Sequence, residues 1–222
     1  MMIVHDFNRG PYPARVRIAL AELDLQDKVR FVEVNLRTGA HKRLEFLEKN
    51  YSGTLPVLEL ADGTFLAECT AITEYLDHLG GQPRLTGISA RERGMIHMMN
   101  KRAEIEFLDP ISVYFHHATP GLGPDVELYQ NPEWGEKMRD KALRAACYFD
   151  EVLSTRPHIA DETFSMADIT VVAAFIFADI VQLEIPPHLG HLHEWHTRMV
   201  ARPSVQGWKE MGRATESSKH RT

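Results

Sequence analysis

The segment that decides the fold lies at residues 52–60 and reads Ser-Gly-Thr-Leu-Pro-Val-Leu-Glu-Leu. Pro56 opens a strand directly after a turn, a position where a proline costs the sheet no hydrogen bond. If the Leu55–Pro56 peptide bond is cis, the carbonyl and amide of Leu55 turn outward and can pair with the main chain of a peptide ligand. The alternative is an edge-strand proline without a ligand.

The residues on either side of this segment alternate between strand and helix patterns. Asp62-Gly63 is a strong hairpin-turn dipeptide. Strands are expected at residues 2–5, 29–35, 57–60 and 64–67, and helices at 13–23, 44–48 and 70–79. The resulting order, βαβ-α-ββ-α, predicts an α+β domain of the thioredoxin-like type.

After Gly80-Gly81-Gln82-Pro83 the pattern becomes almost wholly helical. We therefore expect a thioredoxin-like domain at 1–80, a linker at 81–88 and an all-α helical bundle at 89–222. Capping boxes at Ser89 and Ser165 start two of its helices. The first should run from about 90 to 117 with a bend at Pro110, and the apolar run 169–181 should be the buried centre of the bundle. Further helices are expected at 132–154, 189–201 and 204–212, and the tail from Ser217 should fray.

The composition excludes several classes of protein. Of 222 residues, 25 are Lys or Arg and 31 are Asp or Glu, so the net charge of −6 argues against a nucleic-acid partner. Cys69 and Cys147 are the two cysteines, which is too few for a disulfide framework or a four-cysteine zinc site. No signal sequence or long apolar segment is present. We expect a cytoplasmic protein without a membrane partner.

A second ligand-binding feature follows the hairpin, where Glu68 and Cys69 open a helix. The amides of a helix N-terminus attract a carboxylate, and the Glu68 carboxylate attracts an ammonium group. The two charged groups of an amino acid can therefore be held side by side. The alternative is that Glu68 is a plain helix cap.

Five segments together resemble the cytosolic glutathione transferases in order and spacing, over nearly the whole chain. They are residues 11–20, residues 39–47, Leu55-Pro56-Val57-Leu58, residues 68–72 and Ser165-Met166-Ala167-Asp168. The resemblance implies glutathione as co-substrate, no metal, a small hydrophobic electrophile as second substrate, a homodimer and a role in detoxification.

Carried over residue by residue, the glutathione contacts fall on His41, Lys42, Leu55, Pro56, Glu68 and Cys69. Leu55, ahead of Pro56, would pair with the cysteinyl main chain. Glu68 and Cys69 would hold the γ-glutamyl end, and His41 with Lys42 would meet the glycyl carboxylate. The charges agree with this assignment. The two carboxylates of glutathione would meet a helix N-terminus and donor or cationic groups, and its one ammonium would meet a carboxylate.

The sequence departs from the common family pattern where the glutathione sulfur would lie. Gly10 and Pro13 fall where a serine or cysteine would align. The absence of a cysteine at this helix start argues against thiol-transfer chemistry, which requires a thiolate of low pKa there. Tyr12 is a weaker candidate, because an aromatic residue here more often packs under the sheet.

Ser112 and His116 are the candidate replacements. They lie four residues apart and share one helical face, so together they can hold a water molecule. A free thiol has a pKa of about 8.5, and lowering it by ~1–2 units takes about 1.4–2.7 kcal/mol, which one or two hydrogen bonds supply. Residues 109–123 resemble a yeast-type class in which a serine and a histidine hold such a water. The alternative is that Ser112 bonds back to its helix and His116 packs at the surface.

The expected reaction is therefore attack of glutathione thiolate on a hydrophobic electrophile, with Ser112 and His116 catalytic. Two alternatives stay open: glutathione-dependent reduction of organic hydroperoxides, and a non-catalytic interaction protein of the same fold. His193-Glu194-Trp195-His196 is one residue short of a zinc-protease motif, so we expect its histidines on a solvated helix face without metal.

Overall fold

A computed structural model describes residues 1–212, which form two compact units. The first unit contains residues 1–80 together with residues 201–212 of the described chain, and the second contains residues 81–200. This division differs from the expected helical domain at 89–222, because the segment after Val200 groups with the first unit. The expected fraying from Ser217 concerns residues outside the described part.

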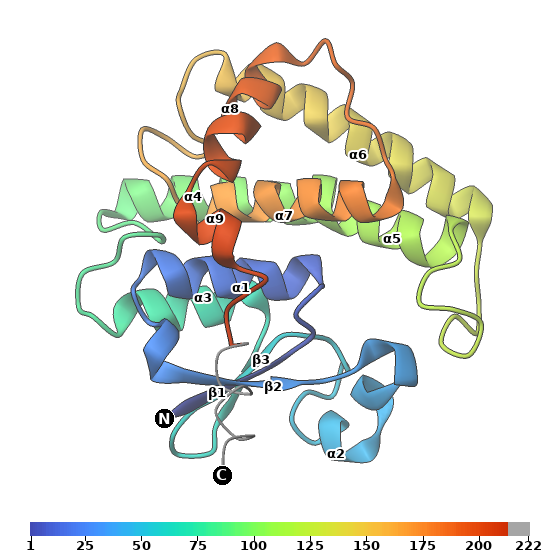
Figure 1. Ribbon diagram of the computed structural model, residues 1–222. Helices are drawn as coiled ribbons and strands as arrows, with labels where there is room; N and C mark the ends of the chain where they lie inside the picture. The colour runs from blue at the N-terminus through green and yellow to red at the C-terminus, as the bar shows by residue number, and fades with distance from the viewer. Residues whose placement is uncertain (213–222) are drawn as a thin grey trace. The chain divides into compact units, whose positions relative to one another are not determined.

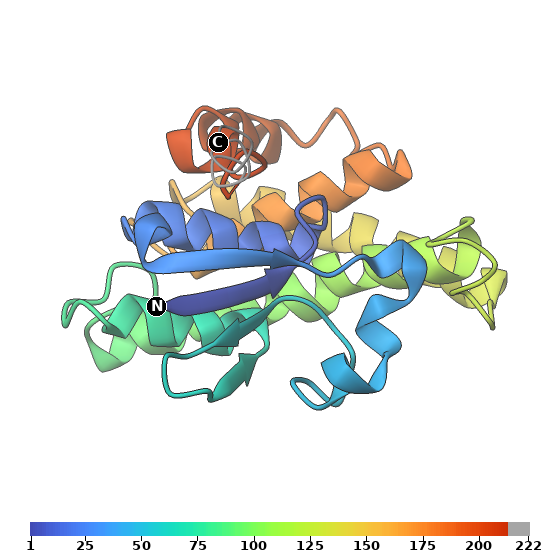
Figure 2. The ribbon, with the colours of Figure 1, turned by 60° about the horizontal axis from the view of Figure 1, so that its bottom comes forward.

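The first unit is built on a four-stranded sheet with strand order β2-β1-β3-β4. Its strands are β1 (Met2–Asp6), β2 (Val29–Glu33), β3 (Val57–Glu59) and β4 (Phe65–Ala67). β1 runs parallel to β2 and antiparallel to β3, so that Val4 pairs with both Phe31 and Leu58 (Figure 2). β3 and β4 form the expected hairpin around Asp62-Gly63, where Gly63 has a φ of +88°.

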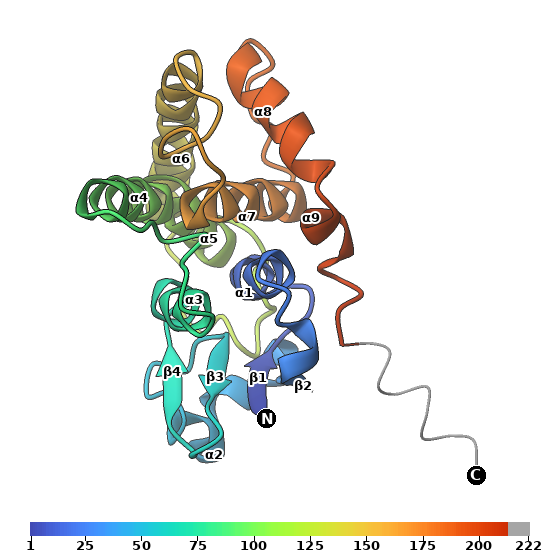
Figure 3. The same ribbon diagram turned by 90° about the vertical axis from the view of Figure 1, so that its left-hand side faces the viewer.

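Residues 1–80 also form three α-helices: α1 (Pro11–Glu22), α2 (Leu44–Leu47) and α3 (Cys69–His78). α1 and α3 lie side by side on one face of the sheet, and α2 lies on the other side (Figure 3). Val4, Leu20, Leu58, Ile72 and Leu76 form the core between the sheet and the two helices. The predicted thioredoxin-like fold is confirmed.

Arg17 explains why the C-terminal segment belongs to the first unit. Its side chain is 3% exposed, and its guanidinium makes two bonds to Asp6, Nε to Oδ2 at 2.6 Å and Nη2 to Oδ1 at 3.1 Å. Nη1 donates to the carbonyls of Trp208 at 3.2 Å and Met211 at 2.6 Å. The side chain thus joins β1, α1 and the C-terminal segment at one point, a link of nearly 200 residues that sequence periodicity cannot reveal.

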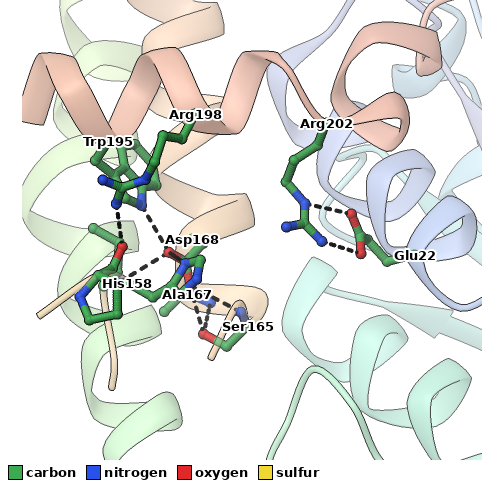
Figure 4. A network of polar contacts seen from close by, with 10 residues as sticks. Glu22, His158, Ser165, Ala167, Asp168, Trp195, Arg198 and Arg202 are labelled. Atoms are coloured by element: carbon green, nitrogen blue, oxygen red, sulfur yellow. Dashed lines mark hydrogen bonds and ion pairs between the residues drawn. The ribbon is translucent and has the colours of Figure 1, made fainter. Parts of the chain in front are cut away.

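A short helix in the same segment, α9 (Pro203–Gly207), packs beside α1. Just before it, Arg202 forms a two-pronged pair with Glu22, at 2.9 and 2.8 Å (Figure 4). The Ser204 hydroxyl donates to the same carboxylate. The helix ends at Gly207, short of the expected 204–212. Beyond it, the carbonyls of Trp208 and Met211 accept from Arg17.

The second unit consists of five helices. They are α4 (Ala90–Arg102), α5 (Asp109–Ala118), α6 (Pro132–Leu153), α7 (Met166–Val181) and α8 (Gly190–Val200). α4 continues into α5 through a π-helical stretch, Ala103–Leu108 (Figure 1). This stretch precedes Pro110, whose missing N–H interrupts the α-helical ladder. Within residues 1–212, no helix is both long and apolar enough to cross a membrane.

The buried carboxylate of Asp168 holds the start of α7, which is the buried helix of this unit. Its Oδ2 accepts from the N–H and hydroxyl of Ser165 at 3.0 and 3.1 Å, which completes the expected capping box. Its Oδ1 accepts from Trp195 Nε1 at 3.0 Å and from the Ile159 amide at 3.1 Å, and lies 3.2 Å from His158 Nδ1 (Figure 4). One side chain therefore fixes a helix start, a loop and α8.

Replacing Arg17 with Met should lower the free energy of unfolding by about 3–5 kcal/mol, because it leaves the Asp6 carboxylate buried without its cation. Urea denaturation would measure the loss. As a control, Arg202→Gln removes a more exposed pair and should cost about 1 kcal/mol or less. Equal losses in the two variants would contradict the special role of Arg17.

Replacing Asp168 with Ala should cost about 3–5 kcal/mol, because several buried donors lose their acceptor at once. Thermal and urea unfolding would test this. Arg91→Gln is the matched control, since it breaks the exposed 2.8 Å pair with Asp161 and should change stability by less than about 1 kcal/mol. A cost for Asp168→Ala within that range would show that the carboxylate is not the organising group.

Candidate functional site

The loop before β3 presents the main chain of Leu55. The Leu55–Pro56 peptide bond is cis. β3 begins at Val57, so Leu55 lies beyond the end of the ladder with β1. Among residues 1–212, neither main-chain group of Leu55 has a hydrogen bond to the protein. These groups are available to an extended ligand.

The side chain of Asn50 fixes the shape of that loop. Its amide donates to the carbonyl and the hydroxyl of Thr54, both at 3.0 Å. Its carbonyl oxygen accepts from the hydroxyl of Ser52 at 3.0 Å and from the Ser52 amide at 3.3 Å. Because Asn50 is buried, these bonds hold the loop in one conformation.

His41 and Lys42 lie in a short 3-10 turn that packs against this loop. The Lys42 ammonium donates to the carbonyls of Ser52 at 3.4 Å and Gly53 at 3.3 Å, while the His41 side chain is buried. Gly53 has a φ of +61°, and a Cβ there would lie 2.7 Å from the His41 carbonyl oxygen. The structure thus brings the predicted residues 41 and 42 to the loop that carries Leu55.

Glu68 stands in an unusual backbone conformation at the start of α3, with φ +68° and ψ 119°. Non-glycine residues rarely adopt a positive φ, and they keep it where the surroundings impose it, often at ligand sites. Glu68 occupies the N-cap position, but its side chain makes no capping hydrogen bond and is exposed. The plain helix-cap alternative is therefore wrong for this side chain.

Cys69 turns its thiol away from the exposed Glu68 side chain and into the core. Its Sγ lies 3.4 Å from the Tyr12 carbonyl oxygen, and the residue is buried among core side chains. The Cys69 thiol therefore faces the core of the first unit. The Tyr12 ring packs against the same cluster, as expected for an aromatic residue in this position.

Ser112 and His116 lie on α5 in the second unit, and both are partly exposed. Within the described residues, the Ser112 hydroxyl makes no hydrogen bond to the protein, so the alternative of a bond back to its own helix is wrong. The His116 ring stands edge-on to Phe115, with centroids 4.9 Å apart. Its Nδ1 lies 2.7 Å from Glu127 Oε1.

Sequence reasoning did not find Glu127. It lies eleven residues after His116 in a loop rich in glycine and proline, where no periodicity predicts which side chain turns back onto the helix. The one available signal is the pair Gly121 and Gly123, both with positive φ, which mark a sharply turned loop.

A side-chain hydrogen bond also connects the two central strands of the sheet. His5 Nε2 on β1 lies 2.7 Å from Glu59 Oε2 on β3. This hydrogen bond holds the pKa of the Glu59 carboxyl below its usual value. The pair therefore fixes the strand that follows Pro56.

The expected solvated face of His193 and His196 is wrong. The His196 ring stacks on Phe175 with centroids 3.9 Å apart, and burial lowers its pKa. His193 Nε2 lies 3.0 Å from the Pro186 carbonyl oxygen. The error arose because helical spacing does not show which aromatic ring a histidine meets. In the part of the chain that the structure describes, no group of three or more candidate ligands could hold a metal ion.

Comparison with known proteins identifies both halves of the chain. The profile described as glutathione S-transferase, N-terminal domain, matches residues 9–79, and the corresponding C-terminal domain profile matches residues 109–203. Glutathione S-transferase 2 of Saccharomyces cerevisiae is 64% identical over 205 residues, covering 92% of this chain and 88% of the yeast protein.

Solved structures agree with these matches. The crystal structure of Gtt2 from Saccharomyces cerevisiae has a TM-score of 0.92 and 63% identity, covering 93% of this chain and 99% of that one. A glutathione S-transferase domain-containing protein from Marinobacter aquaeolei has a TM-score of 0.89 and 48% identity, over 91% of this chain and 99% of that one. The chain therefore belongs to the glutathione S-transferase family of enzymes.

Proposed function

We propose that the enzyme catalyses attack of glutathione thiolate on small hydrophobic electrophiles. Two features of the first unit carry this proposal. Within residues 1–212 the main chain of Leu55 has no hydrogen bond to the protein, and Glu68, at positive φ, has an exposed side chain at the start of α3. An extended peptide with an amino-acid end group has complementary features. Glutathione is such a peptide.

Each part of glutathione has a proposed contact. The main chain of Leu55, ahead of Pro56, pairs with the cysteinyl residue. The Glu68 carboxylate binds the γ-glutamyl ammonium, and the Cys69 amide at the α3 N-terminus binds the adjoining carboxylate. His41 and Lys42 bind the glycyl carboxylate. No metal takes part in the proposed reaction.

We propose that a water molecule held by Ser112 and His116 stabilises the thiolate. The support comes from the second unit itself. Among the residues that the structure describes, the Ser112 hydroxyl has no hydrogen bond to the protein, and Ser112 shares a helical face with His116. His116 Nδ1 lies 2.7 Å from Glu127 Oε1. Lowering a thiol pKa by ~1–2 units takes about 1.4–2.7 kcal/mol. Two hydrogen bonds supply this amount, and binding both substrates together supplies the proximity.

We further propose that the enzyme works in the cytoplasm as a homodimer. Both rest on the family resemblance. Neither Cys69 nor Cys147 is in a disulfide among the described residues, which is in keeping with a reducing compartment.

Conjugation of an aromatic electrophile, followed across pH, tests the catalytic residues. Ser112→Ala and His116→Ala should each lower kcat/KM and move the pH midpoint of activity upward by ~1 unit, because each removes one hydrogen bond that favours the thiolate. Tyr12→Phe should leave both unchanged. Full activity with an unmoved midpoint in both alanine variants would refute the held water. Wild type that binds glutathione and reduces organic hydroperoxides without conjugating would favour the peroxidase alternative.

Glutathione binding measured by calorimetry tests Glu68. Glu68→Gln should weaken binding about 10-fold or more, because it removes the charged partner of the ammonium group. A glutathione analogue without that amino group should bind wild type and variant alike. Glu33→Gln, on the opposite edge of the sheet from the β3–β4 hairpin, is the matched charge control and should bind as wild type does. Equal weakening of the analogue would contradict the contact.

A further inference from the structure

We propose that Glu127 is a positioning residue that fixes the His116 ring with its proton on Nδ1 and leaves Nε2 as a hydrogen-bond acceptor. The inference rests on the proposed role of His116 and adds to it the group that sets the chemical state of the ring. Nothing in the family resemblance assigns a role to Glu127.

The contacts of the carboxylate decide which ring nitrogen carries the proton. Glu127 Oε1 lies 2.7 Å from His116 Nδ1 and also accepts from the Leu122 amide at 2.8 Å. An ionised carboxylate can only accept hydrogen bonds, so Nδ1 must donate. In a neutral imidazole, Nε2 then keeps its lone pair.

The surroundings make this contact a fixed one. The Glu127 side chain is only 10% exposed, whereas the His116 side chain is 38% exposed. Gly121, with φ +56°, lies so close that a Cβ there would overlap the Glu127 side chain. The same oxygen that meets His116 is also held by the main chain of the loop. The buried end of the pair is therefore held by the loop, while the ring reaches toward solvent.

Two further side chains, Gln130 and Thr119, connect the loop to α5 without contacting the His116 ring. Gln130 Nε2 donates to the carbonyls of His116 and Thr119, both at 2.8 Å. The Thr119 hydroxyl donates to the Phe115 carbonyl at 2.6 Å and accepts from the Gly121 amide at 3.1 Å. Gln130 thus offers a control that separates loop structure from ring state.

The neighbouring histidine has the opposite arrangement. His117 Nδ1 accepts a hydrogen bond from the Asn131 amide at 3.1 Å, so its neutral ring must carry the proton on Nε2. Two adjacent histidines on one helix are thus held in different tautomers by different partners. Local sequence cannot set this difference, and the Glu127 contact is what distinguishes His116.

Because Nε2 is a hydrogen-bond acceptor, it fixes the orientation of the held water. The water donates one hydrogen to Nε2 and uses an oxygen lone pair to accept the glutathione S–H. When the S–H proton passes to the water and a water proton passes to Nε2, the products are a thiolate, an intact water and an imidazolium that faces the Glu127 carboxylate. After attack, the proton returns by the same route to the adduct or to the leaving group.

The test compares Glu127→Leu, Glu127→Gln and the control Gln130→Ala. The imidazole ¹⁵N signals of labelled protein report the tautomers, with His117 as an internal reference and His116→Ala for assignment. In Glu127→Leu, His116 should change to the Nε2–H form and kcat/KM should fall about 10-fold or more, with KM for glutathione unchanged. Glu127→Gln keeps a carbonyl acceptor and should retain the Nδ1–H form with part of the activity. Gln130→Ala should keep the wild-type tautomer and rate.

The possible failures are distinguishable. Retention of the Nδ1–H form in Glu127→Leu would overturn the inference, as would an equal loss of activity in Gln130→Ala. Loss of activity in His116→Ala with full activity in Glu127→Leu would overturn the role of Glu127 and leave the held water intact. Full activity in His116→Ala would overturn the water mechanism and this inference together.

Discussion

The buried pair between Arg17 and Asp6 is the constraint on which the first unit depends. A guanidinium withdrawn from water must be paired, and here a carboxylate from β1 and two carbonyls from the C-terminal segment pair it. The strand, the helix and the segment cannot shift independently without leaving a buried charge unmatched. This pairing holds the sheet and α1 in register, and the loop before β3 is built on that sheet.

In the second unit, too, one polar side chain holds several elements together. The carboxylate of Asp168 accepts hydrogen bonds from the start of α7, from a loop and from α8, so one side chain connects all three. A fully satisfied buried network of this kind specifies one arrangement of the helices, whereas apolar packing alone tolerates several. α7 can therefore be apolar over most of its surface and still have a defined start.

Local signals in the sequence predict local features well. The hairpin at Asp62-Gly63 and the capping box at Ser165 each depend on residues within a few positions of one another. The thioredoxin-like order of elements follows from these signals. The family resemblance agrees with them across both domains.

What the sequence does not predict depends on contacts between distant residues. The grouping of the C-terminal segment with the first unit comes from Arg17, the stacking of His196 from Phe175, and the orientation of His116 from Glu127. None of these pairs has a characteristic spacing, because loops and packing place them. The direction of the Cys69 thiol is a similar case, since a helix start does not reveal whether its first side chain faces the ligand or the core.

The π-helical stretch between α4 and α5 has a geometric consequence for the whole unit. Each residue of an α-helix turns the chain by about 100°, and a π-helical turn holds one residue more than an α-helical one. The side chains of α5 are therefore out of phase with those of α4 by that rotation. Residues 103–108 therefore rotate the side chains of α5 about the helix axis relative to those of α4. Ile96 and Met99 of α4 lie in the core, and the directions of Ser112 and His116 on α5 are set independently of them. Loss of one residue there would turn the second pair about the helix axis without disturbing the first.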